Sequence, residues 1–181
     1  MIQVSNRTIK PLHQRYSELD NEVFSAFCNT FKQVDWVADF KDSEDQYCGI
    51  DLQLTAKTSV AEKTYDVELK SVHLNKFLSY CYFQRDKWFS LLQWDNDIKL
   101  YVAIYTNHNK IAIWNVNYDL LRKSEMEYTK MKKNTCKIGQ KTVEKLVYKF
   151  KLEDAKVFDF DLTKYKEKYN ALHKQISSVQ Q

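Results

Sequence analysis

Glycine and proline are scarce in this chain, which limits the kinds of segment that it can contain. Its 181 residues include two glycines, Gly49 and Gly139, and one proline, Pro11. Flexible low-complexity linkers are rich in such residues, so we expect none here, and no internal repeat is visible. A chain of this length can bury a substantial core, and we therefore predict a single domain over residues 1–181.

Long apolar runs and paired cysteines are also missing. The first residues, Met1 to His13, lack the continuous apolar core of a signal peptide, and no run approaches the ~20 apolar residues of a membrane-spanning helix. The cysteines form no Cys-x-x-Cys pair, which favours free thiols over a zinc site or a disulfide framework. We therefore expect a cytoplasmic protein with no membrane partner. The cysteines are Cys28, Cys48, Cys81 and Cys136.

Net charge gives little guidance to the partner. The formal charge of +4 is modest, so binding to nucleic acid has to be argued from local clusters. Lysines gather between positions 130 and 151, interleaved with aromatic residues, as is typical of a surface that follows backbone phosphates. A solvated lysine-rich face or loop is the alternative. The candidate residues for contacts with nucleic acid are Lys130, Lys132, Lys133, Lys137 and Lys141.

Two short segments with alternating polarity dominate the centre of the chain. Residues 50–55 and 66–70 each alternate apolar and polar side chains, which predicts two half-buried strands. The polar segment between them, 57–63, has a length suited to a hairpin loop, so we pair the strands antiparallel. A register that buries both apolar rows sets Asp51 opposite Glu68 or Lys70, on one face.

This constellation resembles the PD-(D/E)XK, or restriction-endonuclease-like, nuclease superfamily. In that family an Asp on one strand and a Glu-x-Lys on the next form the catalytic site; the matching residues here are Asp51, Glu68 and Lys70, while Ile50 replaces the Pro of the motif. The resemblance implies that Asp51, Glu68 and the backbone carbonyl of Leu69 bind Mg²⁺, with Mn²⁺ able to substitute. Lys70 would hold the attacking water. In an ordinary sheet, the same side chains would instead form a solvent-facing row.

Four further residues are supporting candidates. Gln53 lies on the predicted face of Asp51 and could orient it or hydrogen-bond a ligand water. By resemblance, Glu22 on the first helix could reach the metal, and Gln84 and Lys87 could orient the site or touch the phosphate. Solvated helix charges are the alternative for Glu22 and Lys87. Gly49, near Asp51, marks either a close approach to a ligand or a simple bulge.

The rest of the chain predicts a central mixed β-sheet flanked by α-helices, an α/β fold of the restriction-endonuclease-like kind. Ser17 to Asp20 would cap a first helix reaching Phe31. The asparagines in 106–109 suit a tight hairpin turn, and the histidines lack metal-ligand spacing. We expect a core over 16–116, basic and C-terminal elements over 117–176, and a disordered tail over 177–181. The other expected helices are 86–94, 118–123 and 163–176, and the other expected strands are 34–40, 79–84, 99–105, 110–116, 146–151 and 157–162.

These features predict a Mg²⁺-dependent deoxyribonuclease, an endonuclease in preference to an exonuclease. The small size leaves little room for a sequence-reading domain, so cleavage should be weakly sequence-specific or structure-specific. One site cuts one strand, and cleavage of both strands of DNA would need a homodimer. The alternative is a non-catalytic nucleic-acid- or protein-binding module on a nuclease-like core.

Overall fold

A six-stranded mixed sheet forms the centre of the molecule. The computed structural model describes residues 12–40, 50–94, 96, 98–132 and 142–178. The strand order is β1-β2-β3-β5-β6-β9; β3 and β5 are parallel and all other neighbours are antiparallel. The predicted mixed sheet is therefore confirmed. Its strands are β1 (Asp35–Phe40), β2 (Leu52–Lys57), β3 (Glu62–Val72), β5 (Ile98–Tyr105), β6 (Lys110–Asn115) and β9 (Lys156–Asp159).

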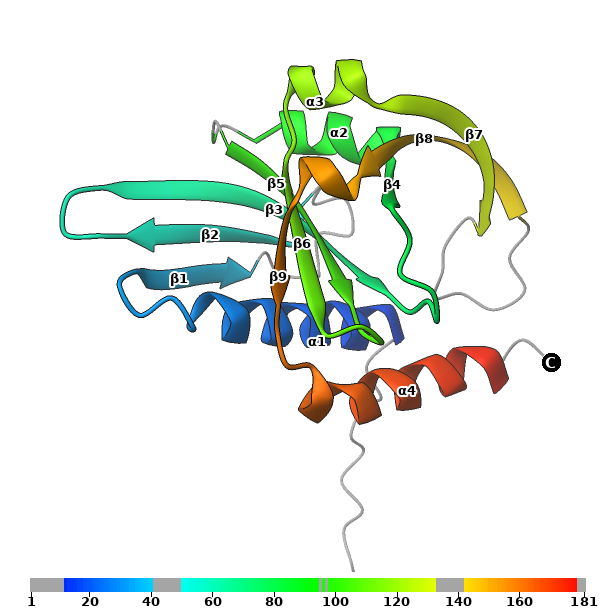
Figure 1. Ribbon diagram of the computed structural model, residues 1–181, viewed down its shortest axis with the longest axis horizontal. Helices are drawn as coiled ribbons and strands as arrows, with labels where there is room; N and C mark the ends of the chain where they lie inside the picture. The colour runs from blue at the N-terminus through cyan, green and yellow to red at the C-terminus, as the bar shows by residue number, and fades with distance from the viewer. Residues whose placement is uncertain (1–11, 41–49, 95, 97, 133–141, 179–181) are drawn as a thin grey trace, which may run out of the picture.

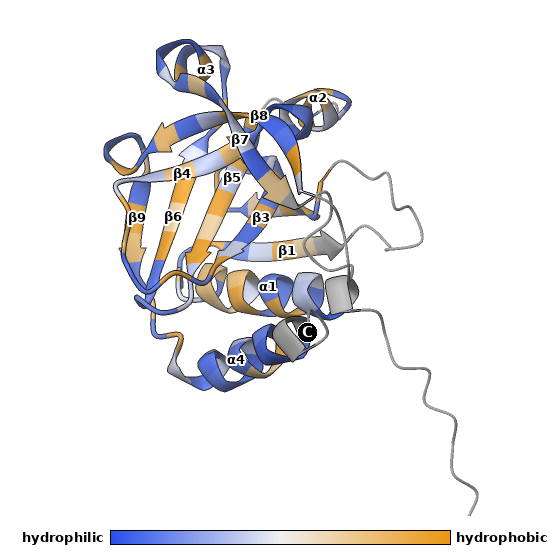
Figure 2. Cartoon of the chain, turned by 90° about the vertical axis from the view of Figure 1, so that its right-hand side faces the viewer, coloured by the Kyte–Doolittle hydropathy of each residue, from blue (hydrophilic) through white to orange (hydrophobic). Residues whose placement is uncertain are grey.

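A smaller antiparallel sheet and the helices cover the two faces of this sheet (Figure 1). Helices α1 and α4 lie on one face, while the smaller sheet, α2 and α3 lie on the other (Figures 1 and 2). The smaller sheet has the order β4-β8-β7 and consists of β4 (Tyr80–Gln84), β8 (Thr142–Lys151) and β7 (Glu125–Lys132). The helices are α1 (Leu12–Cys28), α2 (Arg85–Leu92), α3 (Tyr118–Lys123), α4 (Thr163–Ser178) and the 3₁₀ turn η1 (Leu152–Asp154).

Each face of the central sheet has its own hydrophobic core. Between the sheet and helices α1 and α4, residues such as Val23, Leu52 and Val67 are fully buried. On the other face, Tyr101 and Trp114 pack against the smaller sheet and α2. Apolar residues recur along the central strands β5 and β6 in Figure 2. With cores on both faces, a charged side chain on these strands lies at the sheet edge or is buried at a cost in free energy.

The hairpin of β2 and β3 has the predicted antiparallel pairing. Its ladder runs from Lys57 opposite Glu62 to Leu52 opposite Val67, and the Thr58 hydroxyl accepts a hydrogen bond from the Ala61 amide in the four-residue turn between them. Beyond this ladder, β3 continues to Val72 and pairs with β5 on its other side.

The parallel pairing of β3 with β5 requires the chain to cross the sheet between them. The crossing segment contains β4 and α2. β4, predicted as a strand, joins the smaller sheet, where Gln84 lies opposite Val147 of β8. The turn after β5 is also as predicted, because Asn109 has a positive φ of 52°.

Several elements differ from the sequence prediction: the first helix ends at Cys28 and not at Phe31, the last strand ends at Asp159 and not at residue 162, and β7 was not predicted as a strand. Two further differences concern the ends of the chain. The first helix begins at Leu12, so Ser17 to Asp20 lie inside α1 and are not its N-terminal cap. The last helix extends to Ser178, so the predicted disordered tail includes two helical residues, while 179–181 lie outside the described residues.

Several other predictions can be placed. Gly49, Cys48 and Cys136 lie outside the described residues, while Cys28 and Cys81 are buried free thiols, as predicted. In the described part of the chain, no helix combines the length and apolar character needed to cross a bilayer.

Candidate active site

Asp51 lies where the β2–β3 ladder ends. The last pair of the ladder is Leu52 opposite Val67, and the amide of the preceding Asp51 donates to the Val67 carbonyl at 3.0 Å. The Asp51 carboxylate is close enough to Glu68 to raise the pKa of that carboxyl. The Leu69 amide then donates to the Asp51 carboxylate (N to Oδ2, 2.7 Å). The side chain of Asp51 thus replaces a backbone acceptor and is fixed against β3. Burial raises the pKa of Asp51, although the Lys87 ammonium and the Leu69 amide act in the opposite direction.

Glu68 is the most constrained carboxylate of the site. Its side chain lies on the face of the sheet that carries α2, and only 6% of the residue is exposed. Oε1 forms an ion pair with Lys87 Nζ at 2.7 Å, whereas Oε2 is buried and has no hydrogen-bond partner among the described residues. Burial and the Asp51 carboxylate raise the pKa of Glu68 to about 8. The Lys87 and Lys70 ammoniums act in the opposite direction and lower it. Such a buried, unsatisfied oxygen costs free energy unless a ligand completes it.

Lys70 belongs to the same cluster. It is two residues beyond Glu68, so it lies on the same face of β3, and it is half-buried. Its ammonium is close enough to Glu68 to lower the pKa of that carboxyl. The structure therefore brings together the three residues that the sequence proposed: Asp51, Glu68 and Lys70.

Gln84 and Lys87 also reach the site region. Lys87 contacts Glu68 directly, as described above. Gln84 directly precedes α2, and its Oε1 accepts a hydrogen bond from Lys145 Nζ on β8 at 3.0 Å. Lys145 belongs to the lysine-rich stretch that the sequence indicated as a phosphate-binding surface, but its place beside Gln84 was not predicted, because only the pairing of β8 with β4 brings it there.

Asp20 on α1 is a carboxylate that the sequence analysis missed. Only 7% of it is exposed, and the Tyr169 hydroxyl of α4 donates to its Oδ1 at 2.6 Å. Burial raises its pKa to about 7; the Tyr169 hydrogen bond opposes this rise, and the nearby Asp51 carboxylate adds to it. The available signal was helical spacing, because Asp20 precedes the buried Phe24 and Phe27 by four and seven residues.

Glu22, the candidate chosen on α1, is placed differently from the expectation. It is exposed on the helix surface, where its carboxylate pairs with Lys168 of α4 at 2.9 Å. Glu22 is therefore a surface ion pair between two helices, and Asp20 is the acidic residue of α1 whose charge acts on Asp51. The error follows from the misplaced start of α1, since Asp20 had been read as part of a cap.

Gln53 has a different partner from the one expected. Its Nε2 donates to Asp66 Oδ1 at 3.0 Å instead of contacting Asp51. Asp66 also accepts hydrogen bonds from Asn96 and from Lys99 of β5. Gln53 thus belongs to a separate buried polar cluster, two residues along β3 from Glu68.

The carboxylates of this site fit a divalent cation. Asp51 and Glu68 supply carboxylates on adjacent strands, and Oε2 of Glu68 is a buried acceptor that lacks a partner. Mg²⁺ is commonly held by one or two carboxylates together with several waters, so this pair fits it. Within the described ranges, no three or more His, Cys, Asp and Glu side chains are grouped closely enough to hold a metal ion together. Asp51 and Glu68 would therefore hold the ion together with water and the backbone carbonyl of Leu69, the third ligand that the resemblance implies.

The expected basic surface is only partly described. Lys130 is exposed on β7, where it lies opposite Glu144 of β8. Lys132 ends β7, and Lys133, Lys137 and Lys141 lie outside the described residues. The binding role of this lysine set stays a prediction.

Comparison with known proteins adds no relative. No protein-family model, no curated protein and no solved structure matches the chain. Any assignment of class therefore rests on the residues, the topology and the geometry given above.

Proposed function

We propose that the protein is a metal-dependent nuclease that hydrolyses DNA phosphodiester bonds, with a restriction-endonuclease-like fold. The observation that carries this proposal is the buried Oε2 of Glu68, which lacks a hydrogen-bond partner among the described residues, together with the nearby Asp51 carboxylate, whose charge acts on Glu68. A carboxylate pair buried with an open oxygen is unfavourable in the free protein, and a divalent cation would stabilise it.

The order of elements supports the same proposal. The antiparallel strands β1, β2 and β3 follow α1, and the chain then passes through α2 to β5, which is parallel to β3. This arrangement agrees with the core implied by the resemblance to PD-(D/E)XK nucleases, and the proposed catalytic residues lie at its centre. β7 and β8 of the smaller sheet follow this core in the sequence.

The roles of the side chains follow from their positions. Asp51 and Glu68 would hold Mg²⁺ or Mn²⁺. When bound, such an ion polarises the phosphate and lowers the pKa of a coordinated water. Lys70, on the face of Glu68, would hold the attacking water and offset negative charge that develops on the phosphoryl oxygens. Lys87 keeps Glu68 in one orientation through its 2.7 Å ion pair.

A non-catalytic binding module is the second candidate, and one contact favours it. The Lys87 ammonium already neutralises one oxygen of Glu68 at 2.7 Å, as it would in a protein that needs no metal. Such a module would bind nucleic acid or protein without cutting it. Divalent-dependent hydrolysis separates the two candidates.

A cleavage assay tests the proposal. Covalently closed plasmid and end-labelled single- and double-stranded oligonucleotides of DNA and RNA are incubated with Mg²⁺, Mn²⁺ or EDTA. We expect divalent-dependent nicking of the plasmid, which requires an endonuclease. Lys70→Ala should abolish nicking while leaving DNA binding intact. Lys63→Ala, an exposed lysine of the same strand, should behave like the wild type.

The contrary result is equally clear. If purified wild-type protein leaves all substrates intact with either ion, and Lys70→Ala is indistinguishable from it, the protein is not a nuclease. DNA binding in the absence of cleavage would then favour the binding module. A cytoplasmic location and a homodimer for double-strand cleavage belong to the same proposal.

A further inference from the structure

Lysines from three separate elements lie close enough for their charges to interact, and one of them contacts Glu68. Lys70 comes from β3, Lys87 from α2 and Lys145 from β8. Lys87 contacts Glu68 at 2.7 Å, and Lys145 is held by Gln84, which directly precedes α2. The positive charges of Lys70 and Lys87 both act on Lys145.

The position of Lys145 follows from the pairing of the smaller sheet. β4 ends at Gln84, which lies opposite Val147. Lys145 is two residues before Val147 on β8, so it lies on the same face of the strand but beyond the last residue of β4. From there its side chain turns back to the Gln84 amide oxygen at 3.0 Å. The smaller sheet thus delivers one cation to the edge of the proposed active site.

The electrostatic balance of the lysine cluster favours an anion. Burial lowers the pKa of Lys145, and the Lys70 and Lys87 ammoniums lower it further, while Asp86 acts in the opposite direction. Like charges held together in a partly buried place repel one another, and an anion between them would offset that repulsion. A phosphate group suits lysines, which bind it as point charges.

We infer that Lys145 binds a phosphate of the polynucleotide backbone next to the bond that is cut, so that the smaller sheet forms one wall of the nucleic-acid site. This inference rests on the proposed function, because it takes Asp51 and Glu68 as the site of cleavage. It assigns a binding role to the β4-β8-β7 sheet, whose strands β7 and β8 lie outside the nuclease core predicted over residues 16–116.

Binding of a fluorescein-labelled duplex oligodeoxynucleotide, measured by anisotropy over a range of KCl concentrations, tests the inference. Ca²⁺ replaces Mg²⁺ so that cleavage does not deplete the duplex, and a parallel series contains EDTA. We expect Lys145→Gln to weaken binding at least about tenfold, as for one hydrogen bond to a charged group. It should also reduce the slope of log K against log salt by about 1, as for one phosphate contact. Lys145→Arg should retain most of the wild-type affinity and most of the wild-type salt slope.

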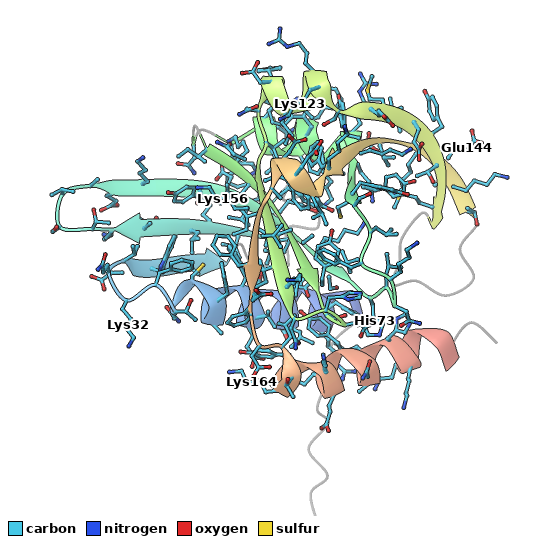
Figure 3. All side chains as sticks on the ribbon, viewed as in Figure 1. Lys32, His73, Lys123, Glu144, Lys156 and Lys164 are labelled. Atoms are coloured by element: carbon cyan, nitrogen blue, oxygen red, sulfur yellow. The ribbon has the colours of Figure 1, made fainter. Side chains whose placement is uncertain are left out.

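The matched control is Lys156→Gln. Lys156 is an exposed lysine on β9, and Figure 3 shows it well separated from Glu144, the neighbour of Lys145 on β8. If Lys145→Gln binds the duplex with the affinity and salt slope of Lys156→Gln, or if the wild type binds no duplex, the inference is wrong. Circular dichroism and the melting temperature of each variant confirm that the fold is retained.

The two proposals can fail separately. Cleavage by the wild type, together with unaltered binding by Lys145→Gln, would overturn the phosphate contact and leave the nuclease standing. Absence of cleavage, together with weaker binding and a smaller salt slope in Lys145→Gln, would overturn the nuclease and support the phosphate contact.

Discussion

Asp66 and Glu68 lie two residues apart on the same face of β3, and both are buried, yet their surroundings differ. Asp66 accepts three hydrogen bonds, from Gln53 at 3.0 Å, Asn96 at 2.7 Å and Lys99 at 2.6 Å. Glu68 has one ion pair, and its Oε2 has no partner within the described structure. The same chemical group is therefore internally satisfied at one position and incomplete at the next.

The difference separates a structural carboxylate from one suited to a ligand. The donors to Asp66 come from β2, from β5 and from the segment before β5, so Asp66 ties three parts of the sheet together. Glu68 Oε2 accepts no hydrogen bond from the described residues, and the nearby Asp51 carboxylate repels the negative charge of Glu68. A buried polar network that is complete adds rigidity, and an incomplete one is unfavourable until something binds.

The largest effect that follows from this comparison concerns metal binding and cleavage. We expect Glu68→Gln, which keeps the shape but removes the charge, to lower Mn²⁺ affinity at least about tenfold and cleavage by roughly a thousandfold, since metal-ion catalysis is worth several kcal/mol. Electron paramagnetic resonance of free Mn²⁺ and plasmid nicking measure the two effects. Asp66→Asn, the matched variant, should leave Mn²⁺ affinity within a factor of a few. Equal loss of Mn²⁺ binding in both variants would erase the distinction between the two carboxylates.

For the free energy of unfolding, we expect substitution of Asp66 to have a larger effect than substitution of Glu68. Asp66→Ala leaves the buried Lys99 ammonium without its carboxylate, and removing one partner of a buried ion pair costs about 3–5 kcal/mol. Urea unfolding followed by circular dichroism measures the loss. Adding Lys99→Met to Asp66→Ala should recover part of it, because no buried charge then remains unpaired. A smaller loss in Asp66→Ala than in Glu68→Ala would contradict the structural role of Asp66.

The raised pKa values predict how stability depends on pH. Burial and the Asp51 charge raise the pKa of Glu68 from 4.5 to about 8, and burial is the main cause that raises that of Asp20 from 3.8 to about 7. Between its ordinary pKa and its raised pKa, each carboxyl is protonated in the folded state and ionised in the unfolded state. The stability that Glu68 and Asp20 contribute is therefore fully present at low pH and is lost as pH rises. In EDTA, the melting temperature should fall from pH 5 to pH 8 by more than about 2–4 °C, equivalent to roughly 1 kcal/mol.

Two comparisons sharpen this pH prediction. Glu68→Gln should flatten the fall, because its side chain no longer titrates. Mg²⁺ should raise the melting temperature of the wild type more at pH 8 than at pH 5, since the ion binds the deprotonated carboxylates and stabilises the folded state by mass action. A wild-type curve that rises from pH 5 to pH 8 in EDTA would show that the buried carboxyls ionise without cost.

Sequence reasoning located the centre of the site because the relevant signals are local. Strict alternation in β2 and β3 determines which side chains share a face, and the pairing of the hairpin brings Asp51, at its end, to the segment of β3 that contains Glu68. Asp20 was missed because the start of α1 was misplaced and Asp20 was taken as part of a cap, although it precedes the buried Phe24 by four residues. The lysine-rich stretch that contains Lys145 was visible in the sequence, but the contact of Lys145 with Gln84 was not, because only the pairing of β8 with β4 brings the two together.

Asp20 is an intermediate case between Asp66 and Glu68, and its dependence on α4 gives the smallest predicted effect. The Tyr169 hydroxyl donates to Asp20 Oδ1 at 2.6 Å and counteracts the rise in pKa that burial causes. We expect Tyr169→Phe to lower the free energy of unfolding by about 1 kcal/mol and to move the pKa of Asp20 above its present value of about 7. Carbon-13 NMR of the aspartate carboxyls follows this titration.

Tyr165→Phe is the control for Tyr169→Phe, because it removes a hydroxyl from a buried tyrosine of the same helix and leaves the Asp20 contact intact. It should leave the Asp20 titration unchanged. If Tyr169→Phe also leaves that titration unchanged, α4 does not set the charge of Asp20. A shift confined to Tyr169→Phe would instead show that a helix outside the proposed nuclease core adjusts the proton affinity of a carboxyl that faces Asp51. Asp20 would then be neither fully satisfied, as Asp66 is, nor open to a ligand, as Glu68 is.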